Sequence, residues 1–250
     1  MQRYFVAKEQ MTDRHIHIIG DDVRHILRVM RMDVGDEIIC SNNDSRTVKC
    51  CISSQTEKEI IADIIEELHP NTELPVHVTI AQGLPKGDKF ELIVQKGTEL
   101  GASGFLPYAA ARSIVKWDKK KAGKKIERLE KIAKEAAEQS YRERIPTVYD
   151  IHSFAELKQE LSSYDAVLLA YEESAKSGEQ AKLVKTLTAL SPRSSILIII
   201  GPEGGMTEEE VSQLTEEGAI PCGFGPRIVR TETASLYALA AISYHFELMR

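Results

Sequence analysis

The last quarter of the chain contains an unbroken apolar run that ends in a glycine-rich turn. Residues 196–200 read ILIII and residues 201–207 read GPEGGMT. An apolar run without alternation is typical of a strand that is buried on both faces of a parallel sheet. Thr207 and Glu210 then have the spacing of a capping box, and Gly218 follows where a helix commonly ends. This strand–turn–helix pattern predicts an α/β fold with a mainly parallel sheet for the C-terminal part of the chain.

A second glycine-bearing turn follows closely. Residues 223–234 read GFGPRIVRTETA. Glycines at the carboxyl end of a strand let backbone N–H groups approach a ligand, and open α/β sheets bind ligands beyond these strand ends. Backbone geometry alone explains one such turn equally well, but two turns, the second carrying Arg227, Arg230 and Glu232, favour a binding site. Neither turn has the G-x-x-x-x-G-K-[ST] or G-x-G-x-x-G pattern, so a P-loop is not predicted.

Two domains are predicted, over residues 1–71 and 73–250. The first contains short alternating apolar segments separated by glycine and Asn/Asp turns, which is typical of a small β-barrel, with one helix over residues 21–30. Pro70, Asn71 and Pro75 mark a linker before a strand that begins at Val76. Beyond it, apolar strands alternate with helical patterns, and this order predicts βαβ units.

The formal net charge of −6 argues against indiscriminate binding of nucleic acid, but the charge is unevenly distributed. Residues 112–144 carry twelve Lys and Arg against six Asp and Glu. A solvated helix face explains the lysines at 116–131 equally well. On the predicted helix over 21–30, Arg24, His25, Arg28 and Arg31 lie opposite the apolar side, and guanidinium groups bind phosphate in bidentate fashion. A selective RNA partner is therefore expected, with surface solubility as the alternative for these arginines.

Several classes of protein are excluded by composition. A hydrophobic content of 42% is ample for a packed core, and the opening MQRYFVAKEQ lacks the apolar segment of a secretory signal. The longest apolar run is far shorter than the roughly 18 residues that span a membrane. The four cysteines have no C-x-x-C spacing, and His15, His17 and His25 have no partners at ligand spacing. We expect a cytoplasmic protein that holds no metal.

The motifs GPEGGMTEEE and GPRIVRTETA together resemble the paired C-terminal motifs of the bacterial small-subunit ribosomal RNA uridine-N3 methyltransferases (RsmE-like), members of the knotted SPOUT class. Further segments match the same family, so the resemblance covers nearly the whole chain: the opening RYF, HILRVMRMDVGD at 25–36, KFELIVQKGTELG at 89–101 and EQSYRERIP at 138–146. Phe224 departs from the leucine that is more usual in the family, at an apolar position.

The resemblance implies a PUA-like RNA-binding β-barrel over residues 1–71 and a SPOUT methyltransferase domain over residues 73–250, whose last quarter forms a trefoil knot. It implies methylation of N3 of a specific uridine in small-subunit (16S) ribosomal RNA, with S-adenosyl-L-methionine as the methyl donor. An assembled or nearly assembled subunit is the expected substrate, with naked RNA as the alternative. It also implies a homodimer. The C-terminal helical stripe is a candidate for the dimer face, with core burial as the alternative: Leu236, Leu239, Ala240, Ile242, Ser243 and Phe246.

Site residues follow from matching these motifs. The cofactor-binding candidates lie in three turns: Ala170, Tyr171, Glu172, Ile200, Gly201, Pro202, Glu203, Gly204, Gly205, Phe224, Gly225, Ile228, Val229 and Arg230. Arg230 is the candidate for stabilising negative charge on the uracil, and Glu232 for orienting Arg230, accepting the proton or capping the following helix. Glu203 could contact the cofactor or cap the turn before residue 207. The RNA-contact candidates are arginines: Arg3, Arg24, Arg28, Arg31, Arg112, Arg142 and Arg144.

Two other functions compete with methylation. One is a non-catalytic RNA-binding protein of ribosome assembly, in which the α/β domain serves as a scaffold. The other is a nucleotide-dependent hydrolase whose turn at residues 201–205 holds phosphate. The hydrolase is disfavoured because no lysine or magnesium-binding Ser or Thr follows the glycines in P-loop fashion.

Overall fold

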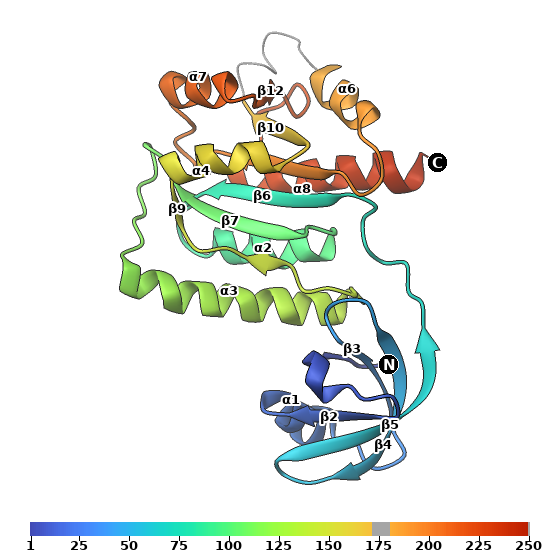
Figure 1. The fold of residues 1–250 in the computed structure, drawn as a ribbon. Coiled ribbons are helices and arrows are strands. Elements are labelled where there is room, and N and C mark those ends of the chain that lie inside the picture. Colours follow the sequence, from blue (N-terminus) through green and yellow to red (C-terminus); the bar gives the residue numbers. More distant parts are fainter. Residues whose placement is uncertain (172–180, 250) are drawn as a thin grey trace. The chain divides into compact units, whose positions relative to one another are not determined.

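The computed structural model describes residues 1–171 and 181–249, which divide into two compact units (Figure 1). The first unit comprises Met1–Glu73 together with Lys134–Ile145, and the second comprises Leu74–Ala133 and Pro146–Arg250. The return of residues 134–145 to the first unit was not part of the division predicted at residues 71 and 73. None of the described helices combines the length and apolar character needed to cross a membrane.

The first unit is built on a curled five-stranded sheet (Figure 1). Its strand order is β1-β3-β4-β5-β2, in which β1 and β3 are parallel and the other neighbours antiparallel. Alternate residues of the strands, including Ile16, Ile18, Ile38, Val48 and Ile60, are buried in one core, as strand geometry requires. The strands are β1 (Arg3–Phe5), β2 (His15–Ile19), β3 (Glu37–Ser41), β4 (Thr47–Gln55) and β5 (Glu59–Leu68), with a short 3₁₀ turn η1 (Lys8–Gln10) after β1.

One helical insert packs against this core. Helix α1 (Asp21–Arg24) continues as a π-helical turn, η2 (His25–Met30), so the predicted helix over 21–30 is confirmed but changes its winding part-way. Val23 and Ile26 are buried, whereas Met30 at the end of the insert is exposed. The wider π turn shifts the residues that follow it relative to a regular α-helical face.

Residues 134–145 bind the first unit through a buried ion pair. Arg142, only 2% exposed, donates from Nε to the Glu73 carboxylate at 2.9 Å. Burial opposes ionisation of Glu73, but hydrogen bonds and the charge of Arg142 outweigh it and hold the Glu73 pKa below its ordinary value. Lys134 donates to Asp22 at 2.7 Å in α1. Some of the basic side chains of residues 112–144 are thus engaged in ion pairs within the protein.

The second unit contains a seven-stranded sheet in which every pairing is parallel. The order is β12-β10-β11-β6-β7-β8, and β9 also pairs with β7. The central position of β11 explains why residues 196–200 are apolar throughout, since both faces of the strand are covered. The strands are β6 (His77–Gly83), β7 (Gly104–Ala109), β8 (Thr147–Val148), β9 (His152–Ser153), β10 (Ala166–Ala170), β11 (Ser195–Ile200) and β12 (Ile220–Cys222).

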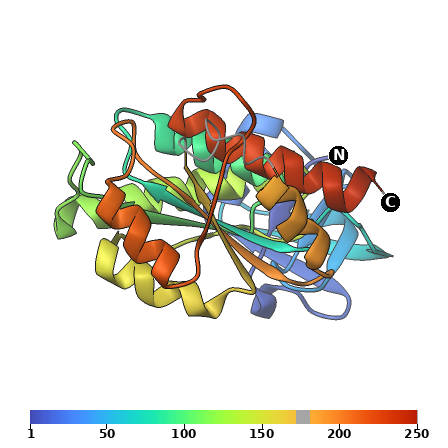
Figure 2. The ribbon, with the colours of Figure 1, turned by 90° about the horizontal axis from the view of Figure 1, so that it is seen from above.

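Helices cover both faces of this sheet, as Figure 2 shows. On one face Leu157 and Leu214, from α4 and α7, join the core formed by Leu197 and Ile199. On the other, α2 lies so close to β7 and α8 that a Cβ on Gly97 would approach Phe105 Cε1 to 2.6 Å and Leu239 Cδ1 to 3.5 Å. The helices are α2 (Lys89–Glu99), α3 (Lys119–Gln139), α4 (Phe154–Glu160), η3 (Leu161–Ser163), α6 (Ala181–Ala189), α7 (Glu208–Glu216), α8 (Thr231–Ser243) and η4 (Tyr244–Leu248).

The predicted start and end of the helix after the first glycine turn are confirmed. Thr207 is the N-cap of α7 and accepts from the Glu210 backbone N–H, while the Glu210 carboxylate accepts from the Thr207 N–H at 2.8 Å. Gly218 follows the C-cap with φ of 96°, a left-handed conformation that favours glycine. The trefoil knot stays a prediction.

Candidate functional site

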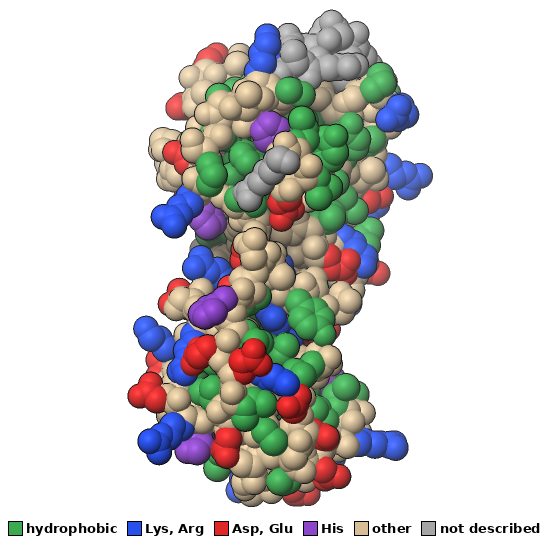
Figure 3. Space-filling model, turned by 90° about the vertical axis from the view of Figure 1, so that its right-hand side faces the viewer, with side chains coloured by type: hydrophobic (Ala, Val, Ile, Leu, Met, Phe, Trp, Pro, Cys, Tyr) green, Lys and Arg blue, Asp and Glu red, His purple; other side chains and the backbone are tan. Residues whose placement is uncertain are grey.

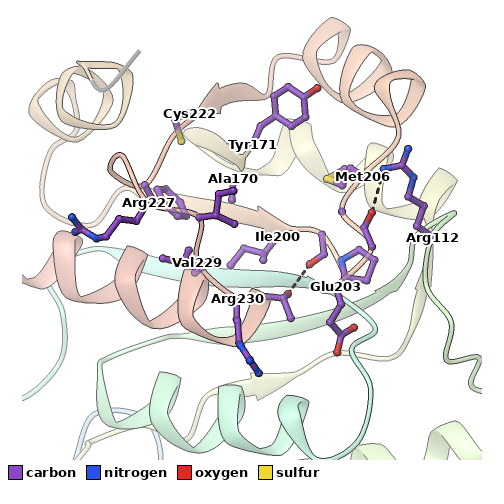
Figure 4. Close-up of a pocket in the computed structure, with 18 of the residues that line it drawn as sticks. Arg112, Ala170, Tyr171, Ile200, Glu203, Met206, Cys222, Arg227, Val229 and Arg230 are labelled. Carbon is purple, nitrogen blue, oxygen red and sulfur yellow. Dashed lines mark hydrogen bonds between the residues drawn. The ribbon is translucent and has the colours of Figure 1, made fainter. Parts of the chain in front are cut away.

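A pocket of about 770 Å³ lies where β10, β11 and β12 end (Figure 4). Each of these parallel strands supplies a terminal residue or the turn that follows it, as expected for the carboxyl edge of an open sheet. The following residues line the pocket: Lys89, Arg112, Ala170, Tyr171, Ile200, Gly201, Pro202, Glu203, Gly204, Gly205, Met206, Glu208, Cys222, Phe224, Pro226, Arg227, Ile228, Val229, Arg230, Thr231 and Ala234.

The first turn is compact enough to require its glycines. A Cβ on Gly201 would lie 2.9 Å from Met206 Cγ and 3.2 Å from the Gly205 carbonyl carbon, and one on Gly204 would lie 3.1 Å from Arg112 Cβ. Gly205 has φ of 69° and donates its N–H to the Pro202 carbonyl at 2.8 Å. The turn therefore presents backbone and small apolar surface to the pocket, which is the lining that lets a ligand contact peptide groups directly.

A hydrogen-bond chain joins the two glycine turns. Thr231 Oγ1, at the start of α8, donates to the Gly201 carbonyl at 2.6 Å. Gln82, the fully buried penultimate residue of β6, donates from Nε2 to Thr231 Oγ1 at 2.8 Å and to the Gly83 carbonyl at 2.9 Å. The pairing predicted from the two motifs is thus realised through Thr231 and Gln82. Sequence reasoning missed both roles: Thr231 lies within the second motif but was not singled out, and Gln82 lies outside both motifs.

Lys89 links both motifs from the beginning of α2. Its ammonium lies 2.9 Å from Glu203 Oε1 and 3.3 Å from Glu232 Oε2. Glu203 also accepts the Lys86 backbone N–H at 3.0 Å. The hydrogen bond to Glu203 raises the pKa of Lys89, and the nearby negative charge of Glu232 raises it further. Thr207, and not Glu203, is the N-cap of α7. Glu203 instead binds the Lys86 backbone and the Lys89 side chain.

Two exposed arginines line the pocket from the second turn. Arg227 and Arg230 are exposed, and Arg230 is the N-cap of α8 without making a side-chain capping bond. In Figure 4 the Arg230 side chain extends towards α2, away from Tyr171 and Cys222. Glu232 does not line the pocket; its side chain is 14% exposed in the first turn of α8, where a carboxylate interacts favourably with the helix dipole.

Most of the predicted cofactor residues lie together. Among those that the structure describes, Gly225 is not in the lining; its φ is 79°, and a Cβ added there would lie 3.3 Å from the Tyr237 hydroxyl, so the glycine serves the backbone. Glu172 lies outside the described residues. Arg112, predicted to contact RNA, lines the pocket and donates to the Gly204 carbonyl at 3.2 Å. Cys222 was missed, although its place at a strand end is a usable signal.

Among its described residues, the pocket lacks an evident nucleophile. Burial raises the pKa of the Cys222 thiol to about 12, with Lys182 weakly opposing, so the thiolate is not formed at neutral pH. Within residues 1–171 and 181–249, no three His, Cys, Asp or Glu side chains are grouped to hold a metal ion. The arrangement is suited to holding a small ligand in place beside an exposed guanidinium, rather than to attacking it.

The remaining RNA-contact candidates divide by exposure. Arg24, Arg28, Arg31 and Arg144 are exposed. Arg3 and Arg142 are 3% and 2% exposed, and Arg3 Nη1 donates to the Arg142 carbonyl at 2.6 Å. Burial leaves these two little surface for phosphate and favours a structural role for Arg142.

Comparison with known proteins identifies the family. Residues 72–243 match the family model described as an RNA methyltransferase domain, and residues 18–65 match that of an RNA methyltransferase PUA domain. The chain belongs to the RNA methyltransferase family. It is therefore a methyltransferase with a PUA-like first unit and a SPOUT-type second unit, and the predicted fold class and enzyme class are confirmed.

Three relatives illustrate the similarity. The ribosomal RNA small subunit methyltransferase E of Bacillus subtilis is 53% identical over 253 residues, covering 100% of this chain and 99% of its own. The enzyme of the same name from Neisseria gonorrhoeae, solved bound to S-adenosyl methionine, is 28% identical, with a TM-score of 0.83 and 97% of each chain covered. A methyltransferase from Legionella pneumophila, solved with the same cofactor, is 27% identical, with a TM-score of 0.81 and 96% of each chain covered.

Proposed function

We propose that this enzyme uses S-adenosyl-L-methionine to methylate N3 of a specific uridine in small-subunit (16S) ribosomal RNA. The observation that carries the proposal is the pocket at the ends of β10, β11 and β12, whose wall is mainly backbone and small apolar groups. Relatives with the same fold are named as ribosomal RNA small subunit methyltransferase E, and one of these was solved with the cofactor.

The pocket residues fit this cofactor. The pocket volume of about 770 Å³ lies within the range of roughly 300–1,000 Å³ that small-molecule sites occupy. Glycine at positions 201 and 204 lets the turn pack closely against Met206 and Arg112, where an added Cβ would clash, and this compact turn leaves its peptide groups open to a ligand. We assign the turns after Ala170, Ile200 and Cys222 to holding it, with peptide groups contacting the adenine edge. When bound, the sulfonium supplies an activated methyl group.

The catalytic roles fall to residues at the start of α8. Uridine N3 carries a proton at neutral pH, so attack on the methyl group requires that this proton leave and that the resulting anion be stabilised. We assign anion stabilisation to the Arg230 guanidinium. We assign acceptance of the N3 proton to Glu232, two residues further along the chain. Lys89 Nζ lies 3.3 Å from Glu232 Oε2. Capping of α8 by Glu232 is the alternative, since this carboxylate lies in the first turn of the helix.

The RNA substrate would be held by the first unit. Its match to a PUA domain of RNA methyltransferases and its exposed Arg24, Arg28, Arg31 and Arg144 support this assignment. We accordingly assign residues 1–71 to RNA binding and 73–250 to methyl transfer. The substrate is ribosomal RNA in an assembled or nearly assembled subunit, which implies that the enzyme acts in the cytoplasm.

A homodimer is part of the proposal, and only part of the predicted stripe, namely Leu236, Ala240 and Ser243, is left unburied for its face. Leu239, Ile242 and Phe246 are buried within the subunit, so the core alternative holds for these three. The exposed apolar side chains of the C-terminal segment are instead Tyr237, Tyr244, Leu248 and Met249. Figure 3 shows hydrophobic side chains gathered around this end of the second unit, as expected for a surface that pairs with a second copy.

Calorimetry and methyl transfer test the proposed activity. We expect the wild-type protein to bind S-adenosylmethionine without RNA or metal and to transfer one methyl group to a uridine of the small subunit. Arg230→Ala should lose turnover by about a hundredfold, the order expected for one anion-stabilising group, with little loss of cofactor affinity. Arg227→Ala, which alters a second exposed arginine of the same pocket, is the matched control and should retain turnover. Equal turnover in the two variants would remove Arg230 from catalysis.

The same assay separates the enzyme from a non-catalytic RNA-binding protein. Mass spectrometry of ribosomal RNA from a strain that lacks the gene should reveal one missing methyl group on one uridine, restored by the wild-type gene and not by the Arg230→Ala variant. Unchanged modification of the RNA in the deletion strain would contradict the proposed substrate.

A further inference from the structure

A second cavity, of about 260 Å³, lies within the first unit and shares no residue with the methyl-transfer pocket. It is lined by the beginning of the chain, by His25 at the start of the π-helical turn η2, and by the end of α3 with the residues after it. Single-turn π segments occur frequently at functional sites. The volume is below that of a site for a drug-sized ligand, and is suited to one flat ring system.

Two buried polar atoms of opposite type, both on residues that line this cavity, lack hydrogen-bond partners within the described part of the chain. One is Arg3 Nε, a donor on a residue that is only 3% exposed; the other is Glu138 Oε1, an acceptor on a side chain that is 12% exposed. Lys134 lies 3.7 Å from Glu138 Oε1, beyond hydrogen-bonding distance. Since buried polar groups are nearly always hydrogen-bonded, two orphans on one cavity indicate that a ligand provides their partners.

An aromatic ring is held at the edge of the same cavity in a strained conformation. Tyr141 has φ of 60°, a left-handed value that is uncommon for an aromatic residue. Its hydroxyl donates to the Met1 carbonyl at 2.9 Å, and its own carbonyl accepts from Thr72 Oγ1 at 2.8 Å. The Arg3 guanidinium lies 5.3 Å from the ring centroid, yet the residue remains 42% exposed. The ring thus keeps surface on which a second flat group can stack.

The composition of the cavity selects among ligands. Glu135 and Glu138 both line it, so a phosphate would meet two carboxylates and is disfavoured. A carboxylate paired with a guanidinium donor matches a nucleobase edge that presents hydrogen-bond donors beside an acceptor. Guanine has this arrangement, because its N1–H and N2–H₂ donors lie next to O6. Its two adjacent donors can both be accepted by one carboxylate.

We propose that this cavity binds one unpaired guanine of the RNA substrate, stacked on Tyr141 with its Watson–Crick edge on Glu138 and Arg3. The inference rests on the proposed function for its RNA. It adds a base-specific contact, distinct from the methylated uridine, to a unit whose exposed arginines are assigned to phosphate, a contact that does not read sequence. Half-buried His25, whose Nδ1 shares a hydrogen bond with the Tyr4 hydroxyl at 3.1 Å, completes the wall.

Titration of the full chain with guanosine 5′-monophosphate tests the inference, with uridine 5′-monophosphate as the competing probe. Chemical shifts of the first unit report binding, and calorimetry of S-adenosylmethionine on the same samples reports the other pocket. We expect the guanosine nucleotide to bind at least tenfold more tightly than the uridine nucleotide. Equal binding of the two would overturn the proposal.

Two variants locate the site without disrupting the fold. Glu138→Gln keeps the shape of the side chain, and Tyr141→Asn removes the ring while tolerating the left-handed backbone. Each should weaken guanosine nucleotide binding by at least tenfold and raise KM for the RNA substrate, with S-adenosylmethionine affinity and kcat unchanged. Glu130→Gln, exposed on α3 and outside the cavity lining, is the control and should change nucleotide binding by less than twofold.

The outcomes separate this inference from the proposed function. If both variants retain guanosine nucleotide binding within twofold of wild type, the cavity is not the site, whatever the methyl transfer assay gives. If the wild type neither binds S-adenosylmethionine nor methylates RNA, the proposed function fails. Nucleotide binding at the cavity is still decided independently, by the titration with the guanosine and uridine nucleotides.

Discussion

Replacing Glu138 by glutamine should stabilise the first unit at alkaline pH and leave it unchanged at acid pH. Burial raises the pKa of Glu138 to about 7 from an ordinary value of 4.5, with Asp22 adding to the shift and Lys134 and a hydrogen bond from the Phe5 N–H opposing it. A carboxyl whose pKa is higher in the folded state binds its proton more tightly there. Stability is therefore full below about pH 4.5 and decreases as the pH rises to about 7.

The magnitude follows from the same difference. Each tenfold change in proton affinity corresponds to about 1.4 kcal/mol, so the ionised Glu138 costs at most ~3 kcal/mol above pH 7. Partial solvent contact of this side chain reduces the value, and we expect about 1–2 kcal/mol. Glutamine carries no charge at any pH and can still accept the Phe5 N–H, so the variant should regain this amount at pH 8 and almost none at pH 4.5.

Hydrogen exchange of the slowest amides in β4 and β5 measures the opening free energy of this unit. The single Trp117 lies in the second unit and would not report it. Glu57→Gln, an exposed side chain of the same unit between β4 and β5, is the control and should show no such pH-dependent gain. A gain of equal size at pH 4.5 and pH 8, or no gain at either, would refute the assigned burial of Glu138.

Three further changes have definite expected outcomes. Gly201→Ala forces Cβ against Met206 and should lower S-adenosylmethionine affinity in calorimetry at least tenfold, whereas Gly123→Ala meets open space and should not. Thr231→Val removes the hydroxyl that joins the two glycine turns. It should weaken cofactor binding by about 1–2 kcal/mol, the value of a hydrogen bond whose partners are left buried. Arg142→Ala leaves the Glu73 carboxylate without its charged partner. The opening free energy of the first unit, measured by hydrogen exchange, should fall by about 3–5 kcal/mol.

Local signals in the sequence predicted the secondary structure around the site well, because each depends on neighbouring residues. The buried strand at 196–200 follows from five consecutive apolar residues, and the start of α7 follows from Thr207 and Glu210 alone. The π-helical winding after Arg24 was not predicted, since it has no local signature. The return of residues 134–145 to the first unit was missed because it depends on Glu73, far away in the chain.

Burial was the property that sequence patterns predicted least well for charged side chains. Seven arginines were assigned to RNA as though all were exposed, yet Arg3 and Arg142 are almost fully buried. A long basic residue next to an aromatic or at the end of a helix has the same local pattern whether it meets phosphate or a carboxylate from another segment. Only the partner, Glu73 for Arg142, distinguishes the two cases, and it lies 69 positions away.

The cofactor pocket illustrates why motifs identify a site before they explain it. The glycine turns supply its surface, but their mutual position depends on Gln82, which reaches Thr231 across 149 positions of sequence. Gln82 lies near the end of the strand next to β11, so one side chain can meet the turn that follows β11 and the helix that follows the second motif. An amide at this position holds both turns because its nitrogen carries two hydrogens and donates to the Gly201 carbonyl and to Thr231 Oγ1. The two motifs are therefore coupled through β6, a strand that belongs to neither.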